Sequence, residues 1–589
     1  MTCERDVTNE IHPARYSATI MTKFRTQCDI PELPFILHVR PYVAAFIGAI
    51  AVLLCCPATL CRASEKQPVA ESSEINAGIP INMSTTPHPG GGSIYIKEYR
   101  VDGAKHLPRN EVEKAVYPFL GPGRSPDDVE GARAALEKAY RASGYQTVSV
   151  QVPQQSEQAV RGGVVVLQVV ETTVGRLRIK GARYFLPSEI RRGAPSLQEG
   201  GVVDFNQVTA DVIALNQLPD RRVTPSLRPG VEPNTVDIDL DVRDTMPLHG
   251  SLELNNRYSA DTTHLRLNGA VNYNNLWQLG HSAGFSFQIA PEDVGEVKVF
   301  SGYYIARFAQ LPCFSLMLEG TKQDSNVSTL GGAAVAGRGE FFGPHAIWTL
   351  PNGKDFYHSL NVGIDYKHFD QNILAGGVEM VTPISYYPIS AAYSASWMNP
   401  GASTELNGSV NFHLRGMGSG ADQFDASRYD AEGNYIYFRG DLSHTHDLPL
   451  GLQIYGKVQG QLSDQPLINS EQFSAGGLST VRGYIESAVL GDNALCGTLE
   501  MRSPSLGTWL GKRVDEWRFY VFTDAGVLSL KQPLPDQESS FRLASYGVGS
   551  HVRFLGHCNG SFDLGLPLIS QGPVSVGDLL LTFRISADF

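Results

Sequence analysis

The chain has 589 residues and a formal net charge of −12, with 18% charged residues, 59 glycines, 24 tyrosines and 26 phenylalanines. This length exceeds one ordinary domain, so two or three folded units are expected. A nucleic-acid-binding protein needs a basic surface, and the acidic balance therefore argues against nucleic acid as a partner. Low charge with many glycines and aromatic residues is typical of a large closed β-sheet.

The N-terminal region has the features of a secretory signal. An apolar run from Val43 to Cys56 follows His38 and Arg40. The run is shorter than the roughly 20 apolar residues that a membrane-spanning helix needs. We therefore predict a signal peptide with a long n-region at residues 1–63, with an uncleaved signal anchor as the alternative. Residues 64–93 are polar and contain four prolines and a run of glycines, which predicts a linker.

Two segments with the same order of predicted elements follow, at residues 94–171 and 172–245. Ser125 suits the N-cap of a helix in the first segment, and Pro126 suits its first position. The first segment is predicted to contain strand Ile94–Val101, helix Arg109–Tyr117, the helix after Ser125, and strands Gln146–Val152 and Gly163–Glu171. The second is predicted to contain strand Val174–Lys180, helices Pro187–Arg192 and Phe205–Leu218, and strands Val223–Leu227 and Thr235–Val242. Each segment is therefore a small α/β module.

Residues 248–589 lose helical periodicity and alternate between apolar and polar side chains. We count sixteen candidate strands there, an even number of mostly 9–11 residues each, as a transmembrane β-barrel requires. Two consecutive ones are Phe356–Phe369 and Tyr387–Trp397. The chain ends on Phe589, which we interpret as the C-terminal signal of an outer-membrane barrel. A soluble propeller is the competing architecture, but no blade repeat of about 40 residues is visible.

The longest connection between the candidate strands runs from Ser463 to Asn493 and is predicted to be functional. The paired glycines Gly476 and Gly477 permit a tight reversal of the backbone. Arg482 is then expected at the tip of the loop, with its guanidinium donors exposed. It is flanked by Val481, Gly483 and Tyr484.

A guanidinium inside a barrel must find a carboxylate or water, because burying it unpaired is costly. The sequence offers Asp524 one strand later, between Phe522 and Gly526. Trp517 and Phe519 take one face of that strand, which places Asp524 on the opposite, lumenal face. We therefore predict an ion pair between Arg482 and Asp524.

These residues resemble the motifs of two-partner secretion transporters, the TpsB class, also called hemolysin secretion/activation proteins. Residues 481–484 match the family's Val-Arg-Gly-Tyr loop motif, and residues 522–526 match its Phe-x-Asp-x-Gly strand motif. The resemblance covers about Ile94 to Phe589. It implies two POTRA domains, at 94–171 and 172–245, before a sixteen-stranded barrel at 248–589. Two departures are Ala494, where the family usually has glycine, and residues 64–93, which do not resemble its pore-plugging helix.

The resemblance also implies a function and its partners. The POTRA domains would capture a partner exoprotein of the hemolysin or adhesin type in the periplasm, and the unfolded partner would cross the outer membrane through the barrel. Outer-membrane lipid and the barrel-assembly machinery are the further partners expected. The second module is expected to bind the exoprotein along an unpaired sheet edge, around Val174–Lys180 and Val223–Leu227. An insertion or assembly factor of the same superfamily is the alternative, and a plain porin would not need the paired modules.

An enzyme is not expected. The segment Gly280-His281-Ser282-Ala283-Gly284 matches the G-x-S-x-G nucleophile elbow, but that motif needs a helix after it. The residues that follow continue as an alternating strand, so the match is attributed to chance. No zinc, phosphate or P-loop spacing appears in the chain, and we expect no catalytic residue, cofactor or metal site.

Overall fold

The structure is a computed structural model that describes residues 94–589 except 261, 329–334, 354, 376–377 and 536. The predicted signal peptide at 1–63 and linker at 64–93 lie outside the described residues. Among the helices that the structure describes, none is both long and apolar enough to cross a membrane. The described chain is mainly β, with two small α/β modules before a closed barrel.

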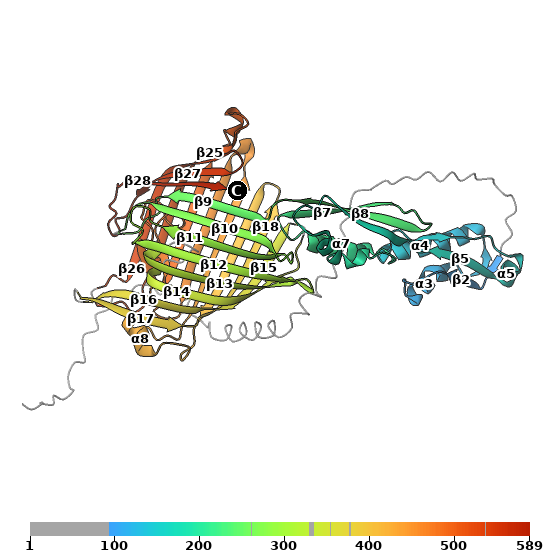
Figure 1. Cartoon of the computed structure of the whole chain (residues 1–589), viewed down its shortest axis with the longest axis horizontal. Helices are drawn as coiled ribbons and strands as arrows, with labels where there is room; N and C mark the ends of the chain where they lie inside the picture. The colour runs from blue at the N-terminus through green and yellow to red at the C-terminus, as the bar shows by residue number, and fades with distance from the viewer. Residues whose placement is uncertain (1–93, 261, 329–334, 354, 376–377, 536) are drawn as a thin grey trace, which may run out of the picture. The chain divides into compact units, whose positions relative to one another are not determined.

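The first module is a three-stranded sheet with two main helices packed against it (blue in Figure 1). Its elements are β2 (Glu98–Asp102), α3 (Arg109–Val116), α4 (Pro126–Ala142), β4 (Ser149–Gln151) and β5 (Val164–Val170). Central β5 pairs in parallel with β2 and antiparallel with β4. Helix α4 begins as predicted, because the Ser125 side chain accepts the Asp128 N–H while the Asp128 carboxylate accepts the Ser125 N–H.

The first predicted strand of this module is in fact two. Strand β1 (Ile94–Ile96) is separate from β2 and pairs with β3 (Gly121–Arg124), and a short helix α5 (Glu157–Gly162) precedes β5. The sequence predicted neither β3 nor α5. Both elements are short, and the glycines and proline of β3 are more typical of a turn than of a strand.

Glu171 closes the first module by binding the backbone that follows β2. Its carboxylate accepts the N–H groups of Lys105 and His106 at 2.9 and 3.0 Å and contacts the His106 ring at 2.7 Å. Burial acts to raise the pKa of Glu171, but these hydrogen bonds from Lys105 and His106 outweigh it and hold the pKa below its usual value. The ionised carboxylate therefore stabilises the folded module.

We expect this contribution to be lost in acid. A carboxylate whose pKa is lower in the folded state stabilises above its unfolded pKa of about 4.3, and loses that effect as the pH falls through the folded value. Hydrogen–deuterium exchange on the full chain, corrected for intrinsic rates, should show protection at Lys105 and His106 falling between about pH 5 and pH 3. Glu171→Gln should be less protected at pH 7 and should lack this pH dependence. Equal profiles for the two proteins would contradict the assignment.

The second module repeats the predicted order of elements. They are β6 (Thr173–Lys180), α6 (Pro187–Arg192), α7 (Phe205–Leu215), β7 (Arg221–Pro229) and β8 (Thr235–Asp244). Strand β8 lies between β6, which runs parallel to it, and β7, which runs antiparallel. The core of the second module includes Ile190, Leu197, Leu215 and Leu240, which are all buried. Helix α7 ends at Leu215, three residues earlier than predicted, where Asn216 forms its C-cap.

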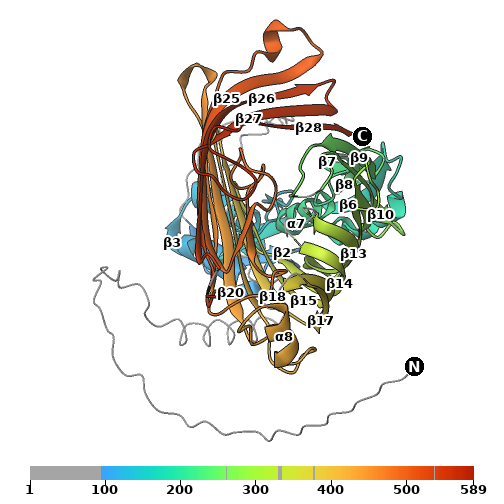
Figure 2. The same ribbon diagram turned by 90° about the vertical axis from the view of Figure 1, so that its left-hand side faces the viewer.

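The barrel is built from eighteen strand segments in a closed ring (Figures 1 and 2). They are β9 (Leu248–Asn255), β10 (Arg266–Leu276), β11 (His281–Ile289), β12 (Val297–Phe308), β13 (Leu311–Ser328), β14 (Val335–Thr349), β15 (Phe356–Ile364), β16 (Tyr366–Ala375), β17 (Val378–Tyr386), β18 (Ile389–Asn399), β19 (Ala402–Phe412), β20 (Ile436–Asp447), β21 (Gln453–Ser463), β24 (Asn493–Arg502), β25 (Val514–Ser529), β26 (Ser540–Phe554), β27 (Cys558–Pro567) and β28 (Leu580–Asp588). Closure satisfies every strand edge, as lipid requires.

Two pairs of these segments are halves of single strands, so the barrel has sixteen strands, as predicted. Segments β15 and β16 both pair with β14 and are separated at Asp365, while β17 and β18 are separated at Tyr387 and Pro388. The β16–β17 hairpin was missed by the sequence analysis, which ended one strand at Phe369 and began the next at Tyr387. Pro383, which lies inside β17, is a signal against a strand.

Phe589 lies at the seam where the barrel closes. Strand β28 pairs with β9 beside it, and the Phe589 N–H donates to the Gly250 carbonyl at 2.9 Å (Figure 2). The Gly250 N–H donates back to the Phe589 carbonyl at 2.8 Å. The last residue of the chain therefore extends the pairing of the last strand with the first.

Candidate functional site

The long loop between β21 and β24, residues 464–492, folds back into the barrel. Strands β22 (Phe473–Ala475) and β23 (Val489–Gly491) pair within it as a short hairpin. Gly476 and Gly477 follow β22 with φ of 107° and 92°, values that favour glycine, and they turn the chain as expected. The loop thus has a paired base and a tip that contacts the wall.

Arg482 lies at this tip, against Asp524 of β25. Its Nε and Nη2 donate to the two Asp524 carboxylate oxygens at 2.7 and 2.8 Å, and its backbone N–H donates to the same carboxylate at 3.0 Å. This fork-to-fork geometry is the strong form of an ion pair. The sequence analysis expected exposed donors, whereas Arg482 is 6% exposed.

Two carboxylates that the sequence analysis missed complete the surroundings of Arg482. Its Nη1 donates to Glu500 of β24 at 2.6 Å and lies 3.5 Å from Asp563 of β27. Arg502 also donates to Glu500, at 2.7 Å, and the Tyr520 hydroxyl donates to Asp563 at 2.8 Å. The tip is therefore bound by three strands of one wall, with a partner for each carboxylate.

Phe522 and Gly526, the other residues of the strand motif, shape the wall beneath the tip. The Arg482 guanidinium carbon lies 3.6 Å from the centroid of the Phe522 ring, within the range of a cation–π contact. A Cβ atom on Gly526 would lie 2.9 Å from the Cys496 sulfur and 3.2 Å from a Val481 methyl. A larger residue at 526 would push Val481 and the loop away from the wall.

The residues after Arg482 fix the loop to the neighbouring strands. Gly483 has φ of 83°, and a Cβ on Gly565 of β27 would lie 2.5 Å from the Gly483 nitrogen, so the two backbones touch. The buried Tyr484 hydroxyl donates to the Ile569 carbonyl at 2.7 Å and accepts the Ala544 N–H at 3.3 Å. Every residue of the loop motif is thus in contact with the wall.

A second anchor, which the sequence analysis did not predict, holds the first half of the loop. The carboxylate of Glu471 is buried and accepts hydrogen bonds from three side chains of a different part of the wall. They are Lys367 of β16 at 2.7 Å, Tyr386 of β17 at 2.6 Å and Tyr437 of β20 at 2.6 Å. A buried carboxylate with three donors is well satisfied.

A third anchor joins the loop to the end of β9. Arg257 donates to Glu486 at 2.6 Å and to the Ser479 hydroxyl at 2.8 Å. Glu486 lies four residues after Arg482. An acidic residue so close to the loop motif was the one feature of the sequence that could have indicated this anchor. Arg257 and Lys367 carried no signal, because their partners lie more than a hundred residues away in the chain.

The G-x-S-x-G match lies in the barrel wall. Residues 281–284 are part of strand β11, where Ser282 is buried and its hydroxyl accepts a hydrogen bond from Arg307 at 2.8 Å. A nucleophile elbow needs a turn into a helix with the hydroxyl exposed, and β11 provides neither. Chance remains the explanation of the match.

The comparisons with known proteins agree with this arrangement. Residues 234–552, more than half of the chain, match the model of the haemolysin secretion/activation protein family ShlB/FhaC/HecB, and residues 94–172 match that of the ShlB-type POTRA domain. The chain belongs to the haemolysin secretion/activation protein family. As a member of that family it is an outer-membrane transporter of two-partner secretion, with a secreted exoprotein as partner and with its POTRA domains in the periplasm.

Individual relatives are distant. The chain is 23% identical to the outer membrane transporter CdiB of Escherichia coli O6:K15:H31 over 555 residues, covering 89% of this chain and 88% of that protein. The solved structure of CdiB from Escherichia coli matches 94% of this chain and 100% of its own, with a TM-score of 0.60 and 20% identity. BamA from Haemophilus ducreyi, lacking POTRA domains 1–3, matches 84% of this chain and 100% of its own with a TM-score of 0.52 and 15% identity, which shows a shared fold alone.

Proposed function

We propose that this transporter captures a hemolysin- or adhesin-type exoprotein on its second POTRA module and passes it, unfolded, through the barrel when the loop at 464–492 withdraws from the wall. The observation that carries this proposal is the buried Arg482–Asp524 pair. Burial of an ion pair in the bore carries a desolvation cost that apolar packing would avoid. A loop that is held by such charges can be released from the wall and can bind it again.

An apolar groove on the second module supports capture there. It lies between α7 and β7, has a volume of about 200 Å³ and is lined by Phe205, Val208, Val212, Ile213, Pro225 and Leu227, among others. Ile213 and Leu227 are 60% and 43% exposed, although both are large and apolar. A groove of this kind suits apolar side chains of an extended or helical segment of the partner.

The edge of β7 adds only a little hydrogen bonding to this groove. Val223 exchanges both of its backbone hydrogen bonds with the Asn216 side chain, so the odd-numbered residues of β7 direct their backbone groups away from β8. Pro225 and Pro229 have no N–H, which leaves Leu227 as the donor between them. We infer that side chains in the groove, rather than a long added strand, provide the affinity.

The edge at β6 is less open than that at β7. The Val174 N–H donates to the Gly201 carbonyl, the Gly200 N–H donates to the Val174 carbonyl, and the Leu177 N–H donates to the Glu199 carboxylate. The segment before α7 therefore already covers this edge. The part of the sequence-based docking proposal that involved Val174–Lys180 is for this reason replaced by the α7–β7 groove.

Two further partners belong to this proposal. Side chains of β25 that point away from the loop, such as Phe519, Val521 and Val527, are apolar and exposed, as contact with outer-membrane lipid requires. The terminal strand with Phe589 is the segment that the barrel-assembly machinery would recognise during insertion. We further propose that the chain has no catalytic role, because its one enzyme-like motif lies within a strand.

Deletion of the gene tests the transport function. A strain without this chain should release the wild-type set of secreted proteins minus one large exoprotein, which should reappear in the medium on complementation. Outer-membrane protein profiles should stay unchanged. An unchanged secretome together with depleted outer-membrane proteins would favour the insertion-factor alternative.

A further inference from the structure

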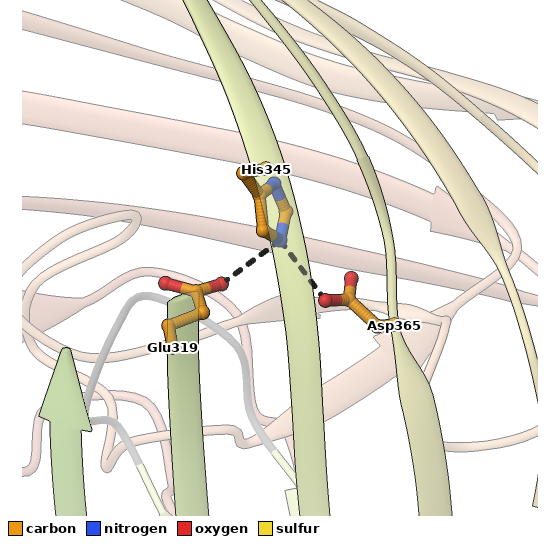
Figure 3. A group of neighbouring side chains, drawn as sticks. All are labelled: Glu319, His345 and Asp365. Carbon is orange, nitrogen blue, oxygen red and sulfur yellow. Dashed lines mark hydrogen bonds and ion pairs between the residues drawn. The ribbon is translucent and has the colours of Figure 1, made fainter. Parts of the chain in front are cut away.

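Three side chains of the types that bind metals converge on the barrel wall away from the loop tip (Figure 3). Glu319 comes from β13, His345 from β14, and Asp365 from the break between β15 and β16. The His345 Nε2 points between the two carboxylates, 3.3 Å from Glu319 and 3.0 Å from Asp365. Within the part of the chain that the structure describes, this is the one group of its kind whose ligand atoms all lie within 4.8 Å of one another.

The cluster is enclosed and its side chains are held in place. The side chains of His345 and Asp365 are 7% and 13% exposed, while that of Glu319 is 35% exposed and leaves a way in from the lumen. A Cβ on Gly363 would lie 2.1 Å from the His345 ring, and one on Gly343 would lie 2.0 Å from the Asp365 carboxylate. The ring and the carboxylate therefore occupy space that only glycine leaves free.

The surroundings of the His345 Nδ1 determine whether the Nε2 is available to bind a metal. Asn361 interacts with His345, and in the described structure neither the buried His345 Nδ1 nor the buried Asn361 Oδ1 has a hydrogen-bond partner. A proton on Nδ1, on the side of Asn361, would leave the Nε2 lone pair free, as in histidines that bind metals through Nε2. In that tautomer the Nε2 lone pair faces two carboxylates at 3.0 and 3.3 Å, and either a metal ion or a second ring proton must lie between them.

The distances from the His345 Nε2 to the two carboxylates fit a transition metal, and all three ligand atoms lie within 4.8 Å of one another. Zinc lies about 2.0–2.2 Å from histidine nitrogen and carboxylate oxygen, so two ligands at bond angles of about 90–110° lie about 3.0–3.4 Å apart. The distances of 3.0 and 3.3 Å from Nε2 fall in this range. An imidazole with two carboxylates suits zinc, manganese or iron, whereas calcium and magnesium prefer oxygen alone.

We propose that Glu319, His345 and Asp365 bind one divalent transition-metal ion on the lumenal wall, with coordination positions left open toward the lumen. No sequence motif announces the site, because the ligands come from three strands and have no fixed spacing. Lys367, which binds the loop residue Glu471, interacts electrostatically with Glu319. The ion would thus lie beside the second anchor of the loop.

Metal binding can be measured directly on the full chain in detergent, produced without a polyhistidine tag and freed of metal by chelation. Calorimetric titration with Zn²⁺ should show a stoichiometry of one bound ion per chain. Each of Glu319→Gln, His345→Gln and Asp365→Asn should weaken this binding at least tenfold. Ca²⁺ should not compete. His358→Gln is the matched control, because His358 is also in the wall but bonds the Tyr393 hydroxyl and the Pro351 carbonyl instead of carboxylates.

A protonated His345 held between two carboxylates is the competing explanation of the same geometry. It predicts no stoichiometric Zn²⁺ binding by the wild-type chain, or equal binding by His345→Gln, and either result would overturn the proposal. Heat-modifiable gel mobility reports whether each variant forms the barrel. If His345→Gln fails to fold, Glu319→Gln decides the question, because Glu319 is the most exposed of the three ligands.

Discussion

Replacement of Arg482 with alanine should reduce export of the partner at least tenfold, while the barrel still forms. The change leaves Asp524, Glu500 and Asp563 facing one another in the bore without the guanidinium that joins them. Removal of one partner from a buried ion pair typically costs about 3–5 kcal/mol. The loop tip should therefore lose its defined position on the wall, so that the cycle of release and rebinding proposed for export cannot be completed. Partner protein in the medium, measured against partner retained in cells, gives the effect.

The controls for this experiment separate the loop contact from general loss of charge. Arg482→Lys keeps a cation but cannot form the fork-to-fork pair, so export should be intermediate. Arg338→Ala removes an exposed arginine of β14 that pairs with Asp324, and export should stay within twofold of wild type. Asp524→Ala should reproduce the defect of Arg482→Ala. Normal export by both Arg482→Ala and Asp524→Ala, with folded barrels, would contradict the proposed role of the loop.

A charge placed in the α7–β7 groove should abolish most partner capture. Ile213→Asp and Leu227→Asp would each put a carboxylate where an apolar side chain of the partner is to be buried, and an unpaired buried charge is costly. We expect each variant to bind the N-terminal secretion domain of the partner at least tenfold more weakly. Because both side chains are well exposed, the module should remain folded. Affinity is measured with the immobilised full-length transporter in detergent.

Val231→Asp is the matched control for the groove variants. Val231 is 77% exposed and follows β7 in the same module, but it does not line the groove. It should therefore bind the partner as the wild type does. Wild-type affinity in all of Val231→Asp, Ile213→Asp and Leu227→Asp would place capture elsewhere on the chain. Loss of binding in all three would indicate that added negative charge, and not the groove, is responsible.

The sequence was sufficient for the fold because its main signals are local. Side-chain alternation identified most barrel strands, and the Ser125 cap located the start of α4. Local signals failed where tertiary pairing overrides them, as in β17, which contains Pro383, and in β1, which separates from β2 at Lys97. These segments are strands because neighbouring chain supplies the hydrogen bonds.

The candidate site was predictable only where a motif exists. Arg482 and Asp524 both stand in recognisable motifs, so the amino-acid sequence alone is enough to propose a pairing between them. Glu500 and Asp563 could not be proposed, since their place beside Arg482 depends on the register of the four strands β24 to β27. The pairing of Glu471 with Lys367 could not be predicted from the sequence either, because nothing in it distinguishes Lys367 from the other lumenal lysines of the barrel.

Attachment of the loop at three separate stretches of wall, through Glu471, Arg482 and Glu486, has a mechanical consequence. A passing polypeptide that dislodges one attachment leaves the others as hinges, about which the segment can swing aside. The freed side chain then stays close to its partner, at a high effective concentration, and returns once the passage clears. In the proposed mechanism, the loop can therefore open and close the passage repeatedly without an external energy source to reset it.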